Sequence, residues 1–228
     1  MEEIITIEEK KKKKKGPFIV GIVILLLAIV GLVNIVGFVA DVVTPQTDED
    51  AALQEYSQFL SWVVGVDPAS FSDITTANKD DLRNIAICSL MNDDVTTSSY
   101  NVTEKGLVVP AADVEQKYIS MYGADTQIVH ASVVGYGYEF VYDAANGVYY
   151  VPLTGVTPPF SVRIESAKVT GDFIQIRVGY VGTSNVEVDA SGVLQAAQPD
   201  KYADVTLKKT DTGYNLISLM AVTVGEHN

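Results

Sequence analysis

The most apolar part of the chain lies close to its N-terminus. Residues 18–40 contain no charged side chain, and Asn34 is the only strongly polar one. A run of this length matches the roughly 20 residues that a helix needs to cross the hydrocarbon of a bilayer. Lipid offers the backbone no hydrogen-bond partners, so such a run must be helical. The pattern therefore predicts a transmembrane helix over residues 18–40.

The charges on either side of this run predict its orientation. The basic run Lys10–Lys15 precedes it and the acidic cluster Asp48–Asp50 follows it. Basic flanks stay in the cytoplasm, so we expect a cytoplasmic tail over 1–17, a linker over 41–48 and an extracytoplasmic domain over 49–228. A cleaved secretory signal is the alternative. The apolar run is too long for it and no A-x-A-like cleavage site follows, which favours an uncleaved signal-anchor in the cell membrane.

Helical spacing of apolar side chains opens the outer domain. It predicts one helix over about 49–65 and a second that starts after the N-cap residue Asn78. A third is expected to start at Pro110, since proline fits the first helical position, and to end at Gly123. The apolar positions that carry these predictions are Leu53, Tyr56, Leu60, Val63, Val64, Leu82, Ile85, Ala86, Leu90, Val114, Tyr118 and Met121.

From residue 126 the apolar period changes to two, which is typical of strands. Helices followed by antiparallel strands predict an α+β domain, with about three helices packed on a curved antiparallel sheet. The segment 93–101 is polar and rich in serine and threonine, which indicates a loop. Strands are predicted at 129–133, at 136–142 and 148–152 around the Asn146-Gly147 turn, on both sides of the 170–172 turn, and in a hairpin over 203–224, with 185–200 as an irregular insertion.

The order of these elements, closed by the hairpin segment Asp211–Ile217 (D-T-G-Y-N-L-I), resembles the nuclear transport factor two-like (cystatin-like) α+β fold. The resemblance covers about residues 49–226. Domains of this type commonly stand outside Gram-positive bacteria on one anchor helix, and the resemblance implies a concave pocket between sheet and helices. Its members include binding modules and enzymes, so the fold alone does not choose between these functions.

Charge and cysteine content limit the partners and the compartment. The chain has a net charge of −13 although its tail holds six lysines, so the excess of acidic residues lies in the outer domain. An acidic domain repels nucleic acid, and we expect no nucleic-acid partner. Cys88 is the only cysteine, which rules out an intramolecular disulfide and fits a bacterial exported protein. Cys88 lies among apolar residues of the second predicted helix, so we expect a buried structural thiol.

Residue types that carry catalysis are sparse. His130 and His227 are the only histidines, and neither has companions at metal-ligand spacing. We expect His130 to be structural, either solvent-facing or hydrogen-bonded. The acidic clusters at 48–50 and 80–81 fit helix N-termini, and 92–94 lacks the pattern of a calcium loop. No phosphate-binding loop or nucleophile motif is present, so we predict no catalytic residue, no metal site and no cofactor.

Tyrosines gather on the hairpin predicted around the Asn146-Gly147 turn. Aromatic pairs across strands stabilise a sheet, and this is the structural interpretation. Tyrosines on an accessible sheet face can also stack on sugar rings or anchor a protein partner. The candidate residues for partner binding are therefore Tyr136, Tyr138, Tyr142, Tyr149 and Tyr150.

These observations predict a non-catalytic, membrane-anchored extracytoplasmic domain that binds a protein or a cell-envelope component. The bilayer itself is the partner of residues 18–40. The alternative is a hydrolase that acts on envelope glycans or peptides, which needs carboxylates about 5–10 Å apart in a cleft. A third hypothesis is a structural domain that dimerises.

Overall fold

The computed structural model describes residues 48–92, 94–135, 137–153, 157–183, 187–188, 194–195 and 197–222. Residue contacts set 50–228 apart as one compact unit. The predicted tail, the predicted transmembrane segment and nearly all of the linker lie outside the described residues. Within the described ranges, no helix is both long enough and apolar enough to span a bilayer.

Helix α2 covers Asp48–Val66 and confirms the helix predicted over about 49–65. The helix stops because Asp67 takes a positive φ of 53° and Pro68 follows it. The Asp67 carboxylate accepts a hydrogen bond of 2.6 Å from Lys201 at the start of a distant strand. Four side chains at helical spacing are buried: Tyr56, Leu60, Val63 and Val64.

Helix α3, Lys79–Met91, begins where the sequence predicted. The side-chain oxygen of Asn78 accepts the backbone N–H of Asp80 at 2.8 Å, which caps the helix. The sequence indicated one apolar face, but burial extends around most of the helix and includes Arg83 and Asn84. Such a helix belongs in the middle of a domain, with packing partners on more than one side.

Helix α5, Ala111–Tyr122, is the third predicted helix. Pro110 takes the N-cap position rather than the first helical position. Gly123 ends the helix as expected, with a φ of 101° and its N–H bonded to the Ile119 carbonyl at 2.8 Å. The hydroxyl of Tyr122 donates a hydrogen bond to the Leu82 carbonyl at 2.9 Å, which fastens α5 to α3.

The larger strands form two antiparallel sheets, so the prediction of one curved sheet was wrong. The five-stranded sheet has the order β1 (Asn101–Thr103), β2 (Gly106–Pro110), β5 (Val148–Val151), β4 (Glu139–Asp143) and β3 (Val133–Val134). The four-stranded sheet has the order β11 (Gly213–Val222), β10 (Lys201–Thr210), β7 (Phe173–Gly182) and β6 (Phe160–Thr170). Smaller elements are η1 (Ile74–Thr76), α4 (Asp94–Thr97), β8 (Glu187–Val188) and β9 (Leu194–Gln195).

Two local predictions differ from the structure for a physical reason. The segment 93–101 was expected to be a loop, yet it holds the short helix α4 and the first residue of β1. The three side chains of β1 are all exposed, so no apolar alternation marks this strand. The strand expected at 129–133 is reduced to β3, since Val129 and Ala131 are exposed and only Val133 reaches the core.

The pairing predicted from strict alternation is confirmed in the four-stranded sheet. β6 and β7 meet at the Gly171 turn, where the glycine takes a φ of 61°. β10 and β11 form the closing hairpin, with Thr210 paired to Gly213. The inward positions of β7 are exposed by no more than 2%: Ile174, Ile176, Val178 and Tyr180.

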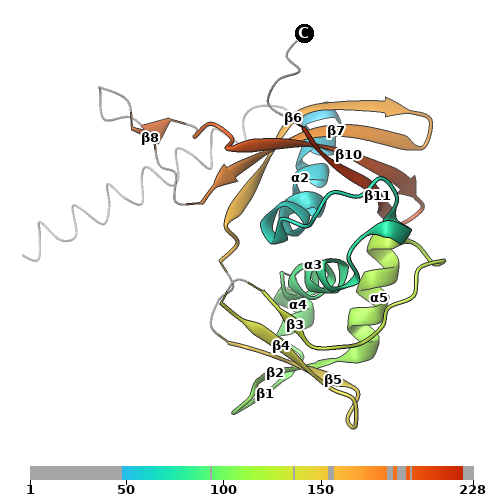
Figure 1. Cartoon of the computed structure of the whole chain (residues 1–228), viewed down its shortest axis with the longest axis vertical. Helices are drawn as coiled ribbons and strands as arrows, with labels where there is room; N and C mark the ends of the chain where they lie inside the picture. Colours follow the sequence, from blue (N-terminus) through green and yellow to red (C-terminus); the bar gives the residue numbers. More distant parts are fainter. Residues whose placement is uncertain are drawn as a thin grey trace, which may run out of the picture. The chain divides into compact units, whose positions relative to one another are not determined.

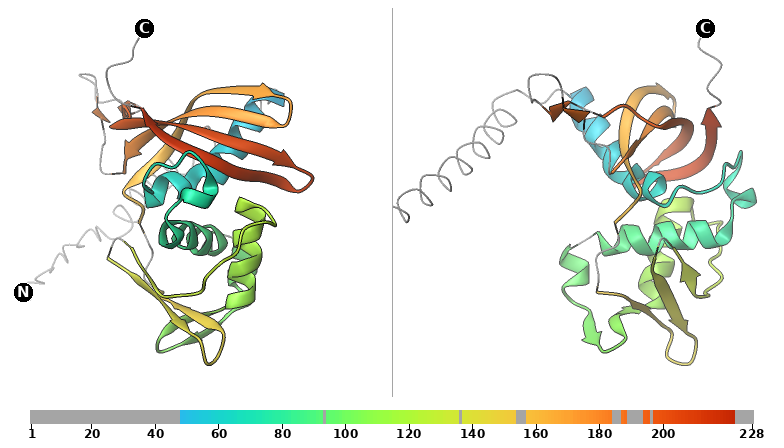
Figure 2. Two further views of the ribbon diagram at one scale, coloured as in Figure 1. Left: turned by 45° about the vertical axis from the view of Figure 1, so that its right-hand side comes forward. Right: turned by 60° about the vertical axis from the view of Figure 1, so that its left-hand side comes forward.

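Helices α3 and α5 lie between the two sheets (Figures 1 and 2). The four-stranded sheet and α2 lie on one side, and the five-stranded sheet lies on the other. Leu207 and Leu216 belong to the four-stranded sheet, and Phe140 and Tyr149 belong to the five-stranded sheet. All four side chains are completely buried in one continuous core. The α+β class is therefore confirmed, with α3 and α5 as a layer between two sheets.

Candidate functional site

The tyrosines of the β4–β5 hairpin lie on both faces of the five-stranded sheet. Tyr142 pairs with Tyr149 on the face toward the helices, and Tyr149 is completely buried. Tyr138, just before β4, donates its hydroxyl to Asn84 of α3 at 2.9 Å. Tyr150 lies on the opposite face, where Lys105 approaches its ring centroid at 4.6 Å. These four candidate tyrosines thus form no single binding face. Tyr136 lies outside the described residues.

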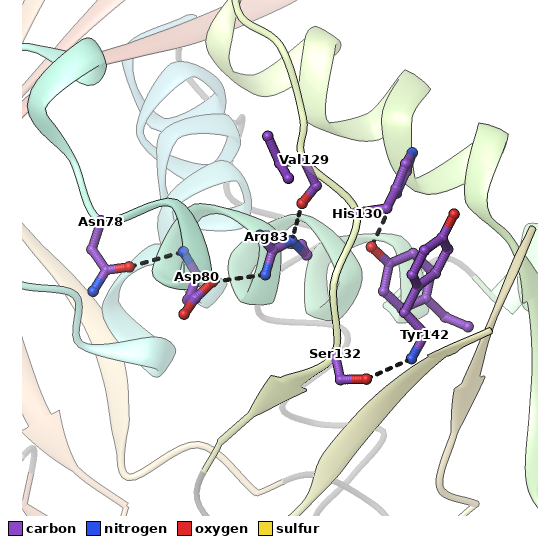
Figure 3. Close-up of polar contacts among 8 residues, drawn as sticks. Asn78, Asp80, Arg83, Val129, His130, Ser132 and Tyr142 are labelled. Carbon is purple, nitrogen blue, oxygen red and sulfur yellow. Dashed lines mark hydrogen bonds and ion pairs between the residues drawn. The ribbon is translucent and has the colours of Figure 1, made fainter. Parts of the chain in front are cut away.

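His130 packs into the same hairpin, in the extended segment before β3 (Figure 3). Its ring stacks on Tyr142 with centroids 5.2 Å apart, and its Nδ1 lies 3.0 Å from the Tyr149 hydroxyl. Burial lowers the pKa of His130; the Glu115 charge opposes this shift and the Arg83 charge adds to it. Burial also raises the pKa of Tyr149 to about 12. A neutral imidazole bonded to a protonated phenol matches the structural role predicted for His130.

Arg83 is the buried cation behind this segment (Figure 3). It is 3% exposed, and its Nε donates to the Val129 carbonyl at 2.8 Å. Its Nη1 forms an ion pair with Asp80 at 2.8 Å, one turn earlier on α3. Arg83 therefore anchors the segment around Val129 to the central helix through Nε, while its Nη1 bonds to Asp80 on the same helix.

Cys88 on α3 is a buried thiol, as predicted. Its exposed fraction is 2%, and burial raises its pKa to about 12. Its sulfur lies 3.5 Å from the Asn84 side-chain oxygen and 3.8 Å from the Tyr138 hydroxyl. Among the described residues no hydrogen bond joins Cys88 to His130. The thiol therefore stays protonated and is a poor nucleophile.

The acidic clusters occupy the positions expected of helix starts. Asp48–Asp50 opens α2, and Asp80 and Asp81 lie in the first turn of α3. Burial of Asp81 raises its pKa, an effect that the N–H of Ala69 opposes. No group of three or more histidine, cysteine, aspartate or glutamate side chains among the described residues is arranged to hold a metal ion.

A large pocket of about 650 Å³ opens between α2, α5 and the β10–β11 turn; we call it the α2–β11 pocket. Phe59 and Trp62 of α2 and Tyr214 of β11 form its aromatic part. The Tyr214 ring contacts Phe59 and Tyr56 edge-on, with centroids 6.0 and 5.3 Å away. Polar lining side chains include Glu55, Gln58, Asn92, Lys117, Lys209 and Asp211.

Two hydrogen bonds hold β11 against the helices at this pocket. The Tyr214 hydroxyl donates to Glu55 of α2 at 2.8 Å, and the Asn215 side-chain amide donates to the Ser120 carbonyl of α5 at 3.0 Å. Each bond links segments far apart in sequence. The walls of the pocket are therefore fixed relative to one another before any ligand arrives.

Only one wall of this pocket could be inferred from the amino-acid sequence. Phe59 and Trp62 flank the apolar stripe of α2, at positions that helical periodicity leaves outside the core. Glu55, Phe59 and Trp62 stand four and three residues apart, so they share one helix face. This second, aromatic face was the available indication. That Tyr214 of the β10–β11 hairpin lies opposite this helix face is visible only in the tertiary fold.

A second, smaller pocket of about 300 Å³ lies between α3 and the five-stranded sheet; we call it the α3–β5 pocket. Its walls are mainly apolar, and it shares Trp62 and Asn92 with the α2–β11 pocket. Apolar lining residues include Met91, Leu107, Phe140, Val151, Pro152 and Leu153.

These two pockets differ in chemistry. The larger one offers aromatic faces beside hydrogen-bonding groups, and the smaller one offers a mainly apolar wall without charged side chains. Comparison of the chain with protein-family models, with curated proteins and with solved structures finds no match.

Proposed function

We propose that this protein is a membrane-tethered, extracytoplasmic binding domain that holds a sugar unit of a cell-envelope component in the α2–β11 pocket. The observation that carries the proposal is the meeting of Phe59, Trp62 and Tyr214 with polar side chains in one preformed hollow. A sugar ring has an apolar face that stacks on aromatic rings and hydroxyl groups that bond to polar side chains.

The tether rests on the sequence. Residues 18–40 are apolar enough to cross a bilayer, and the lysines before them favour a cytoplasmic tail. We therefore place residues 49–228 outside the membrane, anchored to it by a single span. Protease added to intact cells should digest the C-terminal domain and spare an epitope tag attached before residue 10. Protection of the domain until the membrane is permeabilised would contradict this topology.

Binding is tested with the full-length protein embedded in polymer-bounded lipid discs. Gln58 and Asp211 line the pocket and are exposed, so their removal leaves the core intact. Gln58→Ala and Asp211→Ala should each weaken co-sedimentation with purified cell-wall glycan by up to about tenfold, as expected for the loss of one hydrogen bond to the ligand.

The matched control is Glu104→Ala, which removes an exposed carboxylate in the β1–β2 turn, away from both pockets. It should leave glycan binding unchanged. Equal losses in Glu104→Ala and Asp211→Ala would indicate a general charge effect and would contradict the pocket as the binding site.

The alternative function, hydrolysis of an envelope glycan, is favoured by one observation. Glu55 and Asp211 come from different elements and line the same pocket. Glycosidases use such a pair, with the acid in surroundings that keep it protonated. Both carboxylates are exposed, and Glu55 already accepts the Tyr214 hydroxyl, so the arrangement suits binding better. Release of reducing ends from the glycan by the native protein, abolished in Glu55→Gln, would favour hydrolysis instead.

A further inference from the structure

The apolar α3–β5 pocket has a composition that the proposed sugar site does not explain. None of the residues that line it is charged, although the chain as a whole carries 29 acidic and 16 basic residues. Phe140 and Val151 at its base are exposed by no more than 4%, whereas Leu153 at its rim is 64% exposed. The pocket therefore has a buried apolar base and an accessible apolar edge, which suits a hydrocarbon group.

This pocket adjoins the α2–β11 pocket. Trp62 of α2 and Asn92 at the end of α3 contribute to the lining of both. The last turn of α3 separates the two hollows, because Ser89 lines the larger one while Cys88 and Met91 line the smaller one. A ligand that passes over Trp62 can therefore occupy both at once.

The two pockets suit chemically different parts of one ligand molecule. The larger pocket presents carboxylates, amides and lysines beside its aromatic rings, and thus suits a hydroxyl-bearing head group. Most residues that line the smaller pocket are apolar, and Cys88, Asn92 and Thr97 add its polar atoms. This largely apolar lining suits a hydrocarbon chain better than a second sugar. Burial of each methylene of such a chain is favourable, because its apolar surface leaves water.

We propose that the ligand is amphipathic, a glycolipid-type molecule with its sugar head in the α2–β11 pocket and the first part of its single apolar chain in the α3–β5 pocket. The proposal rests on the proposed function, since it assigns the head group to the same site. It adds the chain and the second subsite, so its failure is distinguishable from failure of the sugar site.

Trp62 provides the measurement, because it is the only tryptophan in the chain and borders both pockets. The full-length protein in polymer-bounded lipid discs is titrated with methyl, butyl, hexyl and octyl β-glycosides of glucose and of N-acetylglucosamine, below their micellar concentrations. Trp62 fluorescence reports the dissociation constant. For the sugar that binds, affinity should rise about threefold to fourfold per added methylene until the chain fills the pocket.

Two variants separate the apolar subsite from the sugar site. Leu107→Phe narrows the smaller pocket, and Leu153→Asp places a charge at its exposed rim. Both should keep the affinity for the methyl glycoside and lose the dependence on chain length. Val141→Asp is the matched control, since Val141 is 42% exposed on β4 and lines neither pocket. The glycosides partition into the disc lipid to the same extent for every variant. Differences in affinity between the variants therefore reflect the protein and not the lipid.

The outcomes are distinct. Chain-length dependence that disappears in Leu107→Phe and Leu153→Asp and survives in Val141→Asp supports the proposal. If the methyl glycoside binds and the butyl, hexyl and octyl glycosides bind with the same affinity, the amphipathic ligand is overturned and the sugar site stays in place. Absence of binding by every methyl and alkyl glycoside, with a native melting temperature, overturns both.

Discussion

Tyr214 of β11 donates its hydroxyl to the Glu55 carboxylate of α2 at 2.8 Å, across 159 residues of sequence. Burial and this neighbouring carboxylate raise the pKa of Tyr214, so the phenol remains a donor throughout the neutral range. The same ring packs edge-on against Tyr56 and Phe59. One side chain thereby joins the closing hairpin to the first helix and forms part of the proposed sugar site.

The first prediction separates the two contributions of Tyr214. Tyr214→Phe removes only the hydroxyl, so the free energy of unfolding should fall by about 1 kcal/mol or less. Tyr214→Ala also removes the aromatic contacts and should cost about 2–3 kcal/mol. Urea denaturation followed by circular dichroism measures both. Equal losses in the two variants would show that the ring contacts contribute nothing.

The second prediction concerns the buried cation of α3. Arg83→Met leaves the Val129 carbonyl without its donor and should lower the free energy of unfolding by about 2 kcal/mol. Asp80→Asn removes only the exposed end of the ion pair and should cost less than about 1 kcal/mol. The reverse order of the two losses, measured in urea, would assign the stabilisation to the ion pair instead of the carbonyl bond.

The third prediction is a loss of stability in mild acid through His130. Burial lowers the pKa of His130 in the folded protein, while the unfolded chain titrates near the ordinary value of 6.5. Below that value the unfolded state binds more protons, so the free energy of unfolding falls as pH decreases from about 7 to 5. In His130→Gln this slope should be shallower. Because His227 is present in both proteins, the difference isolates His130; identical slopes would refute the assignment.

The fourth prediction is slow modification of Cys88. A thiol exposed by 2% with a pKa of about 12 is both inaccessible and protonated, so iodoacetamide at pH 8 should label it only upon unfolding. Mass spectrometry should find native protein unlabelled after an hour and denatured protein fully labelled. Labelling of the native state at the rate of a free cysteine would contradict the burial of α3.

Local periodicity was sufficient to predict much of the fold. The Asn78 cap, the buried face of α2 and the alternation along β7 depend on neighbours within a few residues, and each was found where the sequence placed it. The division into two sheets was not predictable in this way. It depends on the pairing of β2 with β5, and β1 beside them carries no buried side chain that would mark it.

The candidate site shows the same limit. The tyrosines of the β4–β5 hairpin were visible as a pattern, but alternation could not reveal that Tyr149 would be covered by the helices. The α2–β11 pocket joins side chains of α2, α3, α5 and the β10–β11 turn, and its two aromatic α2 residues lie beside the core stripe rather than within it. Only the tertiary arrangement brings them together.

The central claim, that a domain outside the membrane holds sugar in the α2–β11 pocket, is tested most directly by photocrosslinking in living cells. A benzophenone-bearing phenylalanine at Gln58 of the full-length protein should capture material that stains for carbohydrate, whereas the same group at Glu104 should not. Carbohydrate capture at Gln58 alone is the predicted result. Capture of the same species from both positions, or of carbohydrate at neither, would contradict the account.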